Sequence, residues 1–302
     1  MFKIYSQTDN KQIIASPEST ILEATLKAGI NHTHVCGGNA RCSTCRVYII
    51  DGLSNCLPRN AKEKQLAERL GFPENIRLAC QTKIRGNITI RRLVVDDLDI
   101  KIILKQFGDT SGTKLGQEKD LTILFTDIEN YTQFAEALPA YDVVHTLNRY
   151  YQTMNDIIVQ HKGIISDVAG DGILALFGVL EDRENPVLDA IDAVRAMHTA
   201  LIRFNAYLHP IYNRSFEIRA GINFGKVIVG SFDTGMMTKI SAIGDVVNLA
   251  SRIEDVNKDF GTRLLISQSA FEKVKGLVKT HKMYHSGLKG KSGEYTLYDI
   301  EV

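Results

Sequence analysis

The hydrophobic and polar positions of this chain follow one pattern up to about residue 100 and another from Leu121 onward. The first part has short runs of alternating apolar and polar residues, which predict β-strands, and two short amphipathic helices. The second part has longer apolar runs that alternate with stretches of helical periodicity, a pattern typical of a mixed α/β unit. In the first part we expect strands at 2–5, 13–15, 46–50 and 87–93 and helices at 21–26 and 61–70; in the second we expect strands at 121–125, 164–177 (two strands around Gly170), 218–229 and 238–243, and helices at 141–159, 187–208 and 246–256.

Local signals refine these elements. Thr20 is followed three residues later by Glu23, which matches a capping box, so we expect the first helix to begin there. The segment 105–120 contains three glycines among many polar residues, which predicts a loop or short connector. A chain of 302 residues has room for about two domains. We therefore expect a first domain at 1–100, a linker or transducing segment at 101–118 and a second domain at 119–302.

The composition is that of an ordinary soluble globular protein, with 44% hydrophobic and 24% charged residues. A formal net charge of +1 argues against a general nucleic-acid binder, which would carry a basic excess. No apolar run approaches the roughly 18 residues that a membrane-spanning helix needs, and the first residues lack the apolar core of a signal peptide. Five cysteines leave one over in any disulfide framework, so we expect a reduced, cytoplasmic setting in which cysteines bind metal.

Four of the five cysteines, Cys36, Cys42, Cys45 and Cys80, are spaced as C-x5-C-x2-C-x34-C. Three thiolates within ten residues, joined by a fourth from far along the chain, are typical of a [2Fe–2S] cluster site. Small residues between the first two cysteines supply a bendable backbone. With the segments CGGNARCSTCRVYI and LACQ, the first domain resembles the [2Fe–2S] ferredoxins of β-grasp fold, in the adrenodoxin-like branch with five residues between the first two ligands. The resemblance implies that these four cysteines are the cluster ligands.

The same spacing argues against other kinds of metal site in this region. Zinc sites usually combine two C-x2-C pairs, whereas Cys80 stands alone at the distant end, so an iron–sulfur cluster is favoured over zinc. Cys56 lies outside the pattern and is expected to be an ordinary thiol rather than a fifth ligand. His32 and His34 flank the loop and could reach a sulfur, although ordinary loop histidines are the simpler interpretation.

Two aspartates mark strand ends in the second domain. Asp127 follows the apolar run LTILFT, and Asp171 lies in a glycine-flanked turn, VAGDGI, between two strand-like runs. A carboxylate at the tip of each of two neighbouring strands forms a hard oxygen site suited to magnesium and a triphosphate. A lone aspartate at a strand end is usually a turn former or helix cap, so the interpretation as a metal site needs support from a third segment. The run AIGDVVNLASRI places Asn248 and Arg252 four residues apart on one helical face.

Together with FTDIENYT, GDGILALFG and GINFGKVIVG, this segment resembles the catalytic domain of class III adenylyl and guanylyl cyclases over about residues 118–300. The resemblance implies a ferredoxin-like α/β fold for the second domain, and hence an α+β protein. It also implies a reaction in which the 3′-hydroxyl of a nucleoside triphosphate attacks its own α-phosphate and releases pyrophosphate. By resemblance, Asp127, Asp171 and the carbonyl of Ile128 hold two Mg²⁺ or Mn²⁺ ions per site, Asn248 orients the ribose, Arg252 stabilises charge on the α-phosphate, and Lys289 and Lys226 contact the triphosphate.

The base-selecting positions depart from the family pattern. The family commonly selects adenine with a lysine in a K-x-x-G-D setting and an aspartate or threonine further on, whereas this chain has Asp167 and Ser241 there. Asp167 could accept from guanine N1–H and N2–H while Ser241 donates to O6, or it could turn away while a backbone group recognises the base. Single-domain bacterial-type cyclases more often use ATP, so we expect conversion of ATP to cyclic AMP, with GTP as the open alternative.

In the resembling family, the metal aspartates and the asparagine–arginine pair of one site come from opposite subunits. This chain carries both sets, which implies a head-to-tail homodimer with two equivalent sites at the subunit interface. The domain order suggests that the redox state of the cluster, set by an electron donor, regulates the cyclase. The complete residue set disfavours two alternatives: an electron-transfer ferredoxin with an inactive cyclase-like dimerisation domain, and a nucleotide sensor without turnover.

Overall fold

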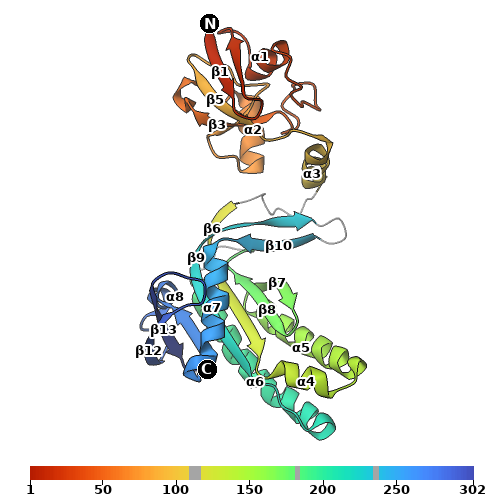
Figure 1. Ribbon diagram of the computed structural model, residues 1–302, viewed down its shortest axis with the longest axis vertical. Helices are drawn as coiled ribbons and strands as arrows, with labels where there is room; N and C mark the ends of the chain where they lie inside the picture. The colour runs from red at the N-terminus through yellow and green to blue at the C-terminus, as the bar shows by residue number, and fades with distance from the viewer. Residues whose placement is uncertain (109–116, 181–183, 234–237) are drawn as a thin grey trace. The chain divides into compact units, whose positions relative to one another are not determined.

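The computed structural model describes residues 1–108, 117–180, 184–233 and 238–302. The chain divides into two compact units, Met1–Leu115 and Gly116–Val302 (Figure 1), and each has its own hydrophobic core. Both units combine helices with β-strands, so the expected α+β class is confirmed. No helix in the described part of the chain is both long and apolar enough to span a membrane.

Within residues 1–108, the N-terminal unit has a five-stranded mixed sheet in the order β2-β1-β5-β3-β4. The parallel pair β1–β5 lies between antiparallel neighbours. Apolar residues on the inner face of these strands, among them Ile4, Val47 and Ile90, are buried against the first helix. The elements are β1 Phe2–Ser6, β2 Lys11–Ala15, α1 Ile21–Lys27, β3 Arg46–Asp51, a 3-10 turn at Leu53–Asn55, α2 Ala61–Leu70, β4 Ile76–Leu78, β5 Ile88–Arg92 and α3 Asp97–Gly108.

Helix α1 begins at the predicted capping box. The N–H of Glu23 donates to Thr20 Oγ1 at 3.2 Å, and the Glu23 carboxylate accepts from the N–H of Thr20 at 2.8 Å. These bonds satisfy two backbone donors that a helix start would otherwise leave unpaired. Ile21 and Leu22 are buried as expected, whereas Leu26 is 39% exposed, so the apolar face of this helix is narrower than its sequence predicts.

The sequence does not predict α3. We expected residues 101–118 to form a connector, yet the helix extends to Gly108. Its start is stabilised by two aspartates: Asp96 Oδ1 accepts from the N–H of Asp99 at 2.9 Å, and Asp99 Oδ2 accepts from the N–H of Val95 at 2.8 Å. Residues 109–116 of the expected connector lie outside the described residues, and β6 begins at Gln117.

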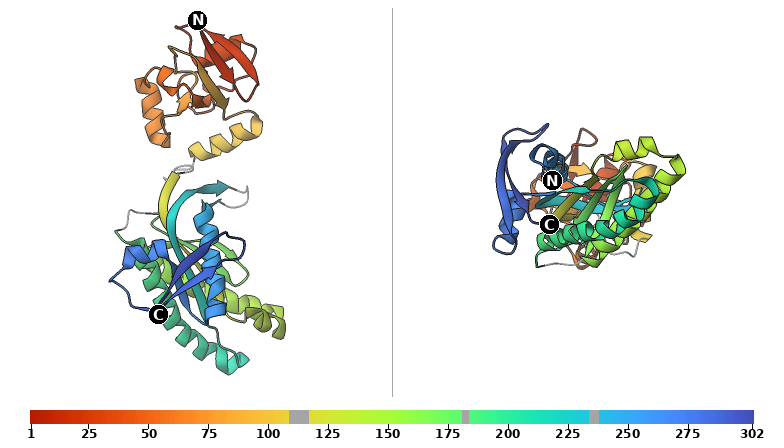
Figure 2. Two further views of the ribbon diagram at one scale, coloured as in Figure 1. Left: turned by 60° about the vertical axis from the view of Figure 1, so that its left-hand side comes forward. Right: turned by 90° about the horizontal axis from the view of Figure 1, so that it is seen from below.

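As far as the chain is described, the C-terminal unit contains an eight-stranded sheet in the order β12-β13-β11-β9-β6-β8-β7, with β10 paired to β9. Helices α5 and α6 pack on one face of the sheet and α7 on the other (Figures 1 and 2). The elements are β6 Gln117–Ile128, α4 Tyr131–Ala137, α5 Ala140–Gln160, β7 Gly163–Ala169, β8 Gly172–Phe177, α6 Pro186–Tyr212, β9 Ile218–Asp233, β10 Thr238–Ile243, α7 Asp245–Phe260, β11 Leu264–Ser267, α8 Gln268–Val274, β12 Thr280–Gly287 and β13 Glu294–Ile300.

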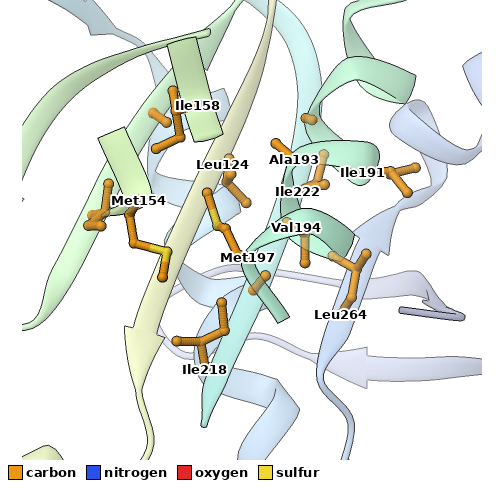
Figure 3. Close-up of a cluster of buried hydrophobic side chains, with 14 of the residues drawn as sticks. Leu124, Met154, Ile158, Ile191, Ala193, Val194, Met197, Ile218, Ile222 and Leu264 are labelled. Atoms are coloured by element: carbon orange, nitrogen blue, oxygen red, sulfur yellow. The ribbon is translucent and has the colours of Figure 1, made fainter. Parts of the chain in front are cut away.

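Alternation along the central strands fills the cores on the two faces of this sheet. Leu264 and Ile266 of β11 belong to the cluster under α5 and α6, whereas Leu265 belongs to the cluster under α7. Figure 3 shows the first cluster, where Met197 of α6 lies near Leu124 of the sheet. Full burial of such a side chain contributes about 1.5–3 kcal/mol to stability, so these layers fix the strand ends that carry the polar residues described below.

A glycine allows α7 to pack directly on the sheet. A Cβ atom built on Gly221 of β9 would lie 2.3 Å from the backbone nitrogen of Glu254, a distance at which atoms cannot pack. Only glycine therefore permits this close approach of strand and helix. This contact sets the position of α7 relative to β9, and α7 carries two of the predicted site residues, Asn248 and Arg252.

Candidate functional site

The structure gathers the four predicted cluster cysteines in two pairs. The thiol of Cys36 neighbours that of Cys42, and the thiol of Cys45 neighbours that of Cys80. Across the described ranges, no three His, Cys, Asp or Glu side chains converge on a position that could hold a single metal ion. In a [2Fe–2S] cluster each iron takes two protein ligands, whereas structural zinc needs four ligands around one ion. Two neighbouring pairs therefore fit the iron–sulfur cluster better than zinc.

The loop around these cysteines depends on unusual backbone angles. Gly37, Gly38 and Ala40 have φ values of 66°, 82° and 54°, in the left-handed region that glycine adopts without strain. The Gln81 side chain donates to the carbonyl of Gly38 at 2.8 Å and to Cys80 Sγ at 3.4 Å. This amide therefore ties the distant fourth cysteine to the loop, a role that the spacing of the cysteines does not reveal.

Neither loop histidine contacts a thiol among the hydrogen bonds of the described residues. His32 is 1% exposed, and its Nδ1 lies 2.9 Å from Thr25 Oγ1. Burial, together with the charge of Arg92, lowers the pKa of His32 to about 4, so its ring is neutral. His34 Nδ1 lies 2.7 Å from the carbonyl of His32. Cys56 is buried away from the pairs, and burial raises the pKa of its thiol.

In the C-terminal unit, antiparallel pairing brings the two predicted metal aspartates together. Strand β6 pairs with β8 in a register that sets Thr126 opposite Ile173, so the end of β6 lies beside the β7–β8 turn. The N–H of Ile128 donates to Asp171 Oδ2 at 3.2 Å. Burial, followed by the hydrogen bond and charge of Asp171, raises the pKa of Asp127 to about 6. The two carboxyl groups thus interact directly.

Further acidic and phenolic groups surround this pair. Glu254 of α7 is 7% exposed, and burial together with the charge of Asp127 raises its pKa to about 7. Burial and the charge of Asp171 raise the pKa of Tyr131, and the Tyr151 hydroxyl donates to the carbonyl of Gly170 in the turn. Burial is the largest cause of each pKa shift, and the neighbouring negative charge, which a bound divalent cation would offset, adds to it. Hard carboxylate oxygens in such a potential fit Mg²⁺ or Mn²⁺.

The predicted ribose and phosphate residues lie on helix α7. Asn248 is exposed on α7, and the Arg252 side chain, 41% exposed, lies 3.5 Å from Asp255. Among the described residues, no hydrogen bond or ion pair joins either side chain to Asp127 or Asp171. The described part of a single chain therefore carries both sets of residues without a direct polar contact between them.

The two predicted triphosphate lysines are both exposed. Lys289 lies in the loop between β12 and β13, and the neighbouring Lys291 forms an ion pair with Asp245, the first residue of α7. This pair anchors the loop beside the helix that carries Asn248. Lys226 lies 3.6 Å from Glu118, with side chains 66% and 69% exposed, so its charge is shared with a carboxylate.

The predicted base-selecting residues lie on two strands that contact each other through side chains but are not paired in the sheet. Asp167 is on β7 and Ser241 is on β10, and Ser166 Oγ lies 3.4 Å from Ser241 Oγ. The structure adds a residue that the sequence did not single out: Lys239 Nζ lies 2.9 Å from Asp167 Oδ2. Its place on β10, two residues before Ser241 and so on the same face of the strand, was the available signal.

Comparison with protein families agrees with this two-part arrangement. Residues 114–301 match the family described as "Adenylate and Guanylate cyclase catalytic domain". Residues 4–85 match the family described as "2Fe-2S iron-sulfur cluster binding domain". The first match includes both aspartates and α7, and the second includes all four paired cysteines.

Two curated relatives resemble the C-terminal part. Adenylate cyclase 1 of Rhizobium meliloti is 30% identical over 195 residues, which is 63% of this chain and 28% of the relative. An adenylate cyclase of Anabaena cylindrica is 31% identical over 174 residues, which is 56% of this chain and 34% of the relative. The chain thus spans about a third or less of the length of these relatives.

Two solved structures resemble the same part. The guanylyl cyclase Cya2 is 31% identical with a TM-score of 0.57, and the match covers 61% of this chain and 93% of that one. The adenylyl cyclase CyaB from P. aeruginosa is 27% identical with a TM-score of 0.57, covering 62% of this chain and 96% of that one. One structure is named for each nucleotide, so the fold alone does not identify the base.

Proposed function

Because this chain belongs to the family of adenylate and guanylate cyclase catalytic domains and also carries a 2Fe-2S domain, we propose that it converts ATP to 3′,5′-cyclic AMP and pyrophosphate. The observation that carries the proposal is the direct interaction of Asp127 with Asp171 at adjacent strand ends. In the reaction, the 3′-oxygen forms a bond to the α-phosphorus, and the bond from that phosphorus to the β-phosphate oxygen breaks.

Asp127, Asp171 and the carbonyl of Ile128 would hold two Mg²⁺ or Mn²⁺ ions. Bound there, such ions lower the pKa of the attacking hydroxyl and offset the charge of the triphosphate. The Ile128 N–H, bonded to Asp171 Oδ2, orients that carboxylate. The Tyr151 hydroxyl holds the turn that carries Asp171. These contacts fix the carboxylates before substrate arrives, so less reorganisation is needed during the reaction.

The remaining groups would come from a second copy of the chain. Asn248 orients the ribose and Arg252 stabilises the charge that develops on the α-phosphate, while Lys289 and Lys226 contact the triphosphate. Their exposure on one copy is what a homodimer with active sites at the subunit interface requires. Positioning and electrostatic stabilisation account for most of the rate enhancement in phosphoryl transfer, and these residues supply both.

Turnover of ATP and GTP by the purified full chain, with Mg²⁺ or Mn²⁺, tests the proposal. We expect cyclic AMP and pyrophosphate in equal amounts, with ATP used more efficiently than GTP. A preference for GTP would replace ATP as the substrate and leave the cyclase reaction in place. The absence of cyclic product from both nucleotides, in protein that is folded and dimeric, would overturn the reaction itself.

The N-terminal unit would regulate this activity through its cluster. The pairs Cys36–Cys42 and Cys45–Cys80 would each hold one iron, and the bound cluster supplies one-electron redox chemistry. A change of cluster charge, driven by an electron donor, would then shift the geometry of the cyclase dimer. We expect cyclase activity to differ among the oxidised, reduced and cluster-free protein. Equal activity in all three would leave the cluster a structural role.

A further inference from the structure

Asp167, which occupies the position where the resembling cyclases use a lysine, is paired with a lysine from the neighbouring strand. Lys239 Nζ lies 2.9 Å from Asp167 Oδ2, so β10 supplies a cation beside the carboxylate of β7. The two side chains are 35% and 54% exposed. An ion pair this exposed contributes little to stability, so stability does not explain why it lies beside Ser241.

The surrounding backbone brings the side chains of Asp167, Lys239 and Ser241 close together. The register of β7 against β8 shifts between Ile165 and Asp167, and such a bulge redirects side chains. Ser166, 4% exposed, donates to the carbonyl of Ile240 at 3.0 Å and so holds β7 against β10. Lys239 and Ser241 share one face of β10 because side chains alternate along a strand. Asp167, Lys239 and Ser241 therefore form one polar cluster.

We propose that Lys239 is a specificity-determining residue, donating to N1 of adenine while Asp167 accepts from the 6-amino group. This inference rests on the cyclase reaction proposed above. An ammonium group has three hydrogens, and Asp167 uses one of those on Lys239. The Watson–Crick edge of adenine presents an acceptor next to a donor, which is the complement of a lysine next to an aspartate.

Guanine also presents an acceptor, O6, next to a donor, N1–H, and differs from adenine at this pair by its second donor, N2–H. Its N1–H and N2–H donors are best met by a carboxylate that offers both oxygens side by side. In this structure Asp167 Oδ1 accepts from the N–H of Val168 at 3.1 Å, and Oδ2 accepts from Lys239. Each carboxylate oxygen therefore already accepts one hydrogen, so the one further bond that adenine requires is easier to form than the two that guanine requires.

The chain path assigns the pair to one half of the shared site. Strand β10 ends at Ile243 and α7 begins at Asp245, so Lys239 is joined by a short segment to the helix that carries Asn248 and Arg252. Lys239 and Arg252 therefore belong to the same half of an active site, opposite the metal aspartates of the second copy.

Substrate analogues combined with Lys239→Met test the inference on the full-length protein. The probes are ATP and 1-deaza-ATP, in which a carbon replaces N1. The wild type should use 1-deaza-ATP roughly 10- to 100-fold less efficiently than ATP, as loss of a hydrogen bond to a charged group predicts. Lys239→Met should use both with the same low kcat/KM. The matched control Lys282→Met, on the exposed strand β12, should keep the wild-type ratio.

The outcomes separate the two proposals. A wild type that uses 1-deaza-ATP as efficiently as ATP overturns the role of Lys239, and this result needs no variant. So does a Lys239→Met protein that keeps the wild-type ratio. A wild type that forms no cyclic product from any nucleotide instead overturns the proposed function. The double variant Asp167→Lys/Lys239→Asp exchanges the two charges. It should use ATP more efficiently than Lys239→Met does, and equal or lower efficiency would contradict base recognition by this pair.

Subunit mixing tests whether Lys239 and the metal aspartates of one active site come from different copies of the chain. Lys239→Met mixed with Asp171→Ala should regain ATP turnover, because one site of each mixed dimer then has an intact Lys239 and an intact Asp171. Lys239→Met mixed with Arg252→Ala should not, because both lesions lie in the same half of the site. The reverse pattern would place Lys239 with the metal aspartates and overturn the assignment.

Discussion

The two units of this protein complete their sites in different ways. In the N-terminal unit, one loop and Cys80 bring four cysteines together as two pairs within a single copy of the chain. In the C-terminal unit, the carboxylates of Asp127 and Asp171 interact with each other, while Asn248 is exposed and Arg252 is half-buried on α7. The first site forms within one copy from a loop and a distant cysteine, whereas no hydrogen bond or ion pair among the described residues joins the two residue sets of the second.

This difference shows how far the spacing of residues along the sequence can predict that they form one site. Ligands on a loop whose backbone curls back on itself gather because few dihedral angles separate them, as the left-handed Gly37 and Gly38 illustrate. Asn248 and Arg252, in contrast, lie on a helix, and no hydrogen bond or ion pair among the described residues joins them to the carboxylates at the strand ends. A complete set of residues in one sequence therefore predicts a site, but not that one copy forms it.

The largest expected effect comes from removing a metal carboxylate. Asp127→Ala should lower cyclase turnover by about a thousandfold or more, because hydroxyl activation and charge neutralisation are lost together. Formation of cyclic nucleotide measures the change, and circular dichroism checks the fold. The matched control is Asp259→Ala, which changes an exposed aspartate near the end of α7 and should keep full activity. Near-normal turnover by Asp127→Ala would refute the metal assignment.

The second prediction tests the division between subunits. Asp171→Ala and Arg252→Ala should each be nearly inactive, yet a one-to-one mixture that exchanges subunits should regain about a quarter of wild-type turnover. Half of the dimers are then mixed, and each mixed dimer has one intact site of two. A mixture as inactive as its components, in dimers shown to exchange, would mean that each copy forms its own site.

The sequence predicts features that depend on nearby residues better than features that depend on distant ones. The capping box, the cysteine set and the strand ends at Asp127 and Asp171 depend on local pattern, and each lies where the pattern indicates. The sequence pattern does not predict β12, whose residues are mostly exposed and polar, or β11, which has only four residues. Lys239 and Gln81 were missed for a different reason. Their partners, Asp167 and Gly38, lie far away in the sequence, and only tertiary structure brings such residues together.

The third prediction tests whether the paired cysteines hold the cluster. Cys42→Ala should lose iron and visible absorbance, because it removes one thiolate of a pair. Cys56→Ala is the matched control, since Cys56 is 8% exposed and Cys42 is 7% exposed, yet Cys56 lies outside both pairs. It should keep its iron. Equal iron loss in both variants would mean that packing around a buried thiol, rather than ligation, holds the cluster.

The smallest expected effect concerns acid stability, where the two units are alike. Each contains a histidine, His32 or His198, whose pKa burial lowers to about 4. A histidine in the unfolded chain has a pKa of about 6.5, so the unfolded state binds a proton first as the pH falls, and stability is lost from about pH 6.5 down to about pH 4. For His198 the loss between pH 7 and pH 5 should be roughly 1–2 kcal/mol.

His198→Gln should remove that loss from the C-terminal unit alone, because glutamine does not titrate. Calorimetry at pH 7 and pH 5 measures the effect, and the transition that nucleotide and Mg²⁺ shift upward identifies the C-terminal unit. The N-terminal transition, which contains His32, is the internal control and should lose the same stability in both proteins. If the C-terminal transition of the variant falls with pH as steeply as that of the wild type, carboxylates rather than His198 set the acid sensitivity of this unit.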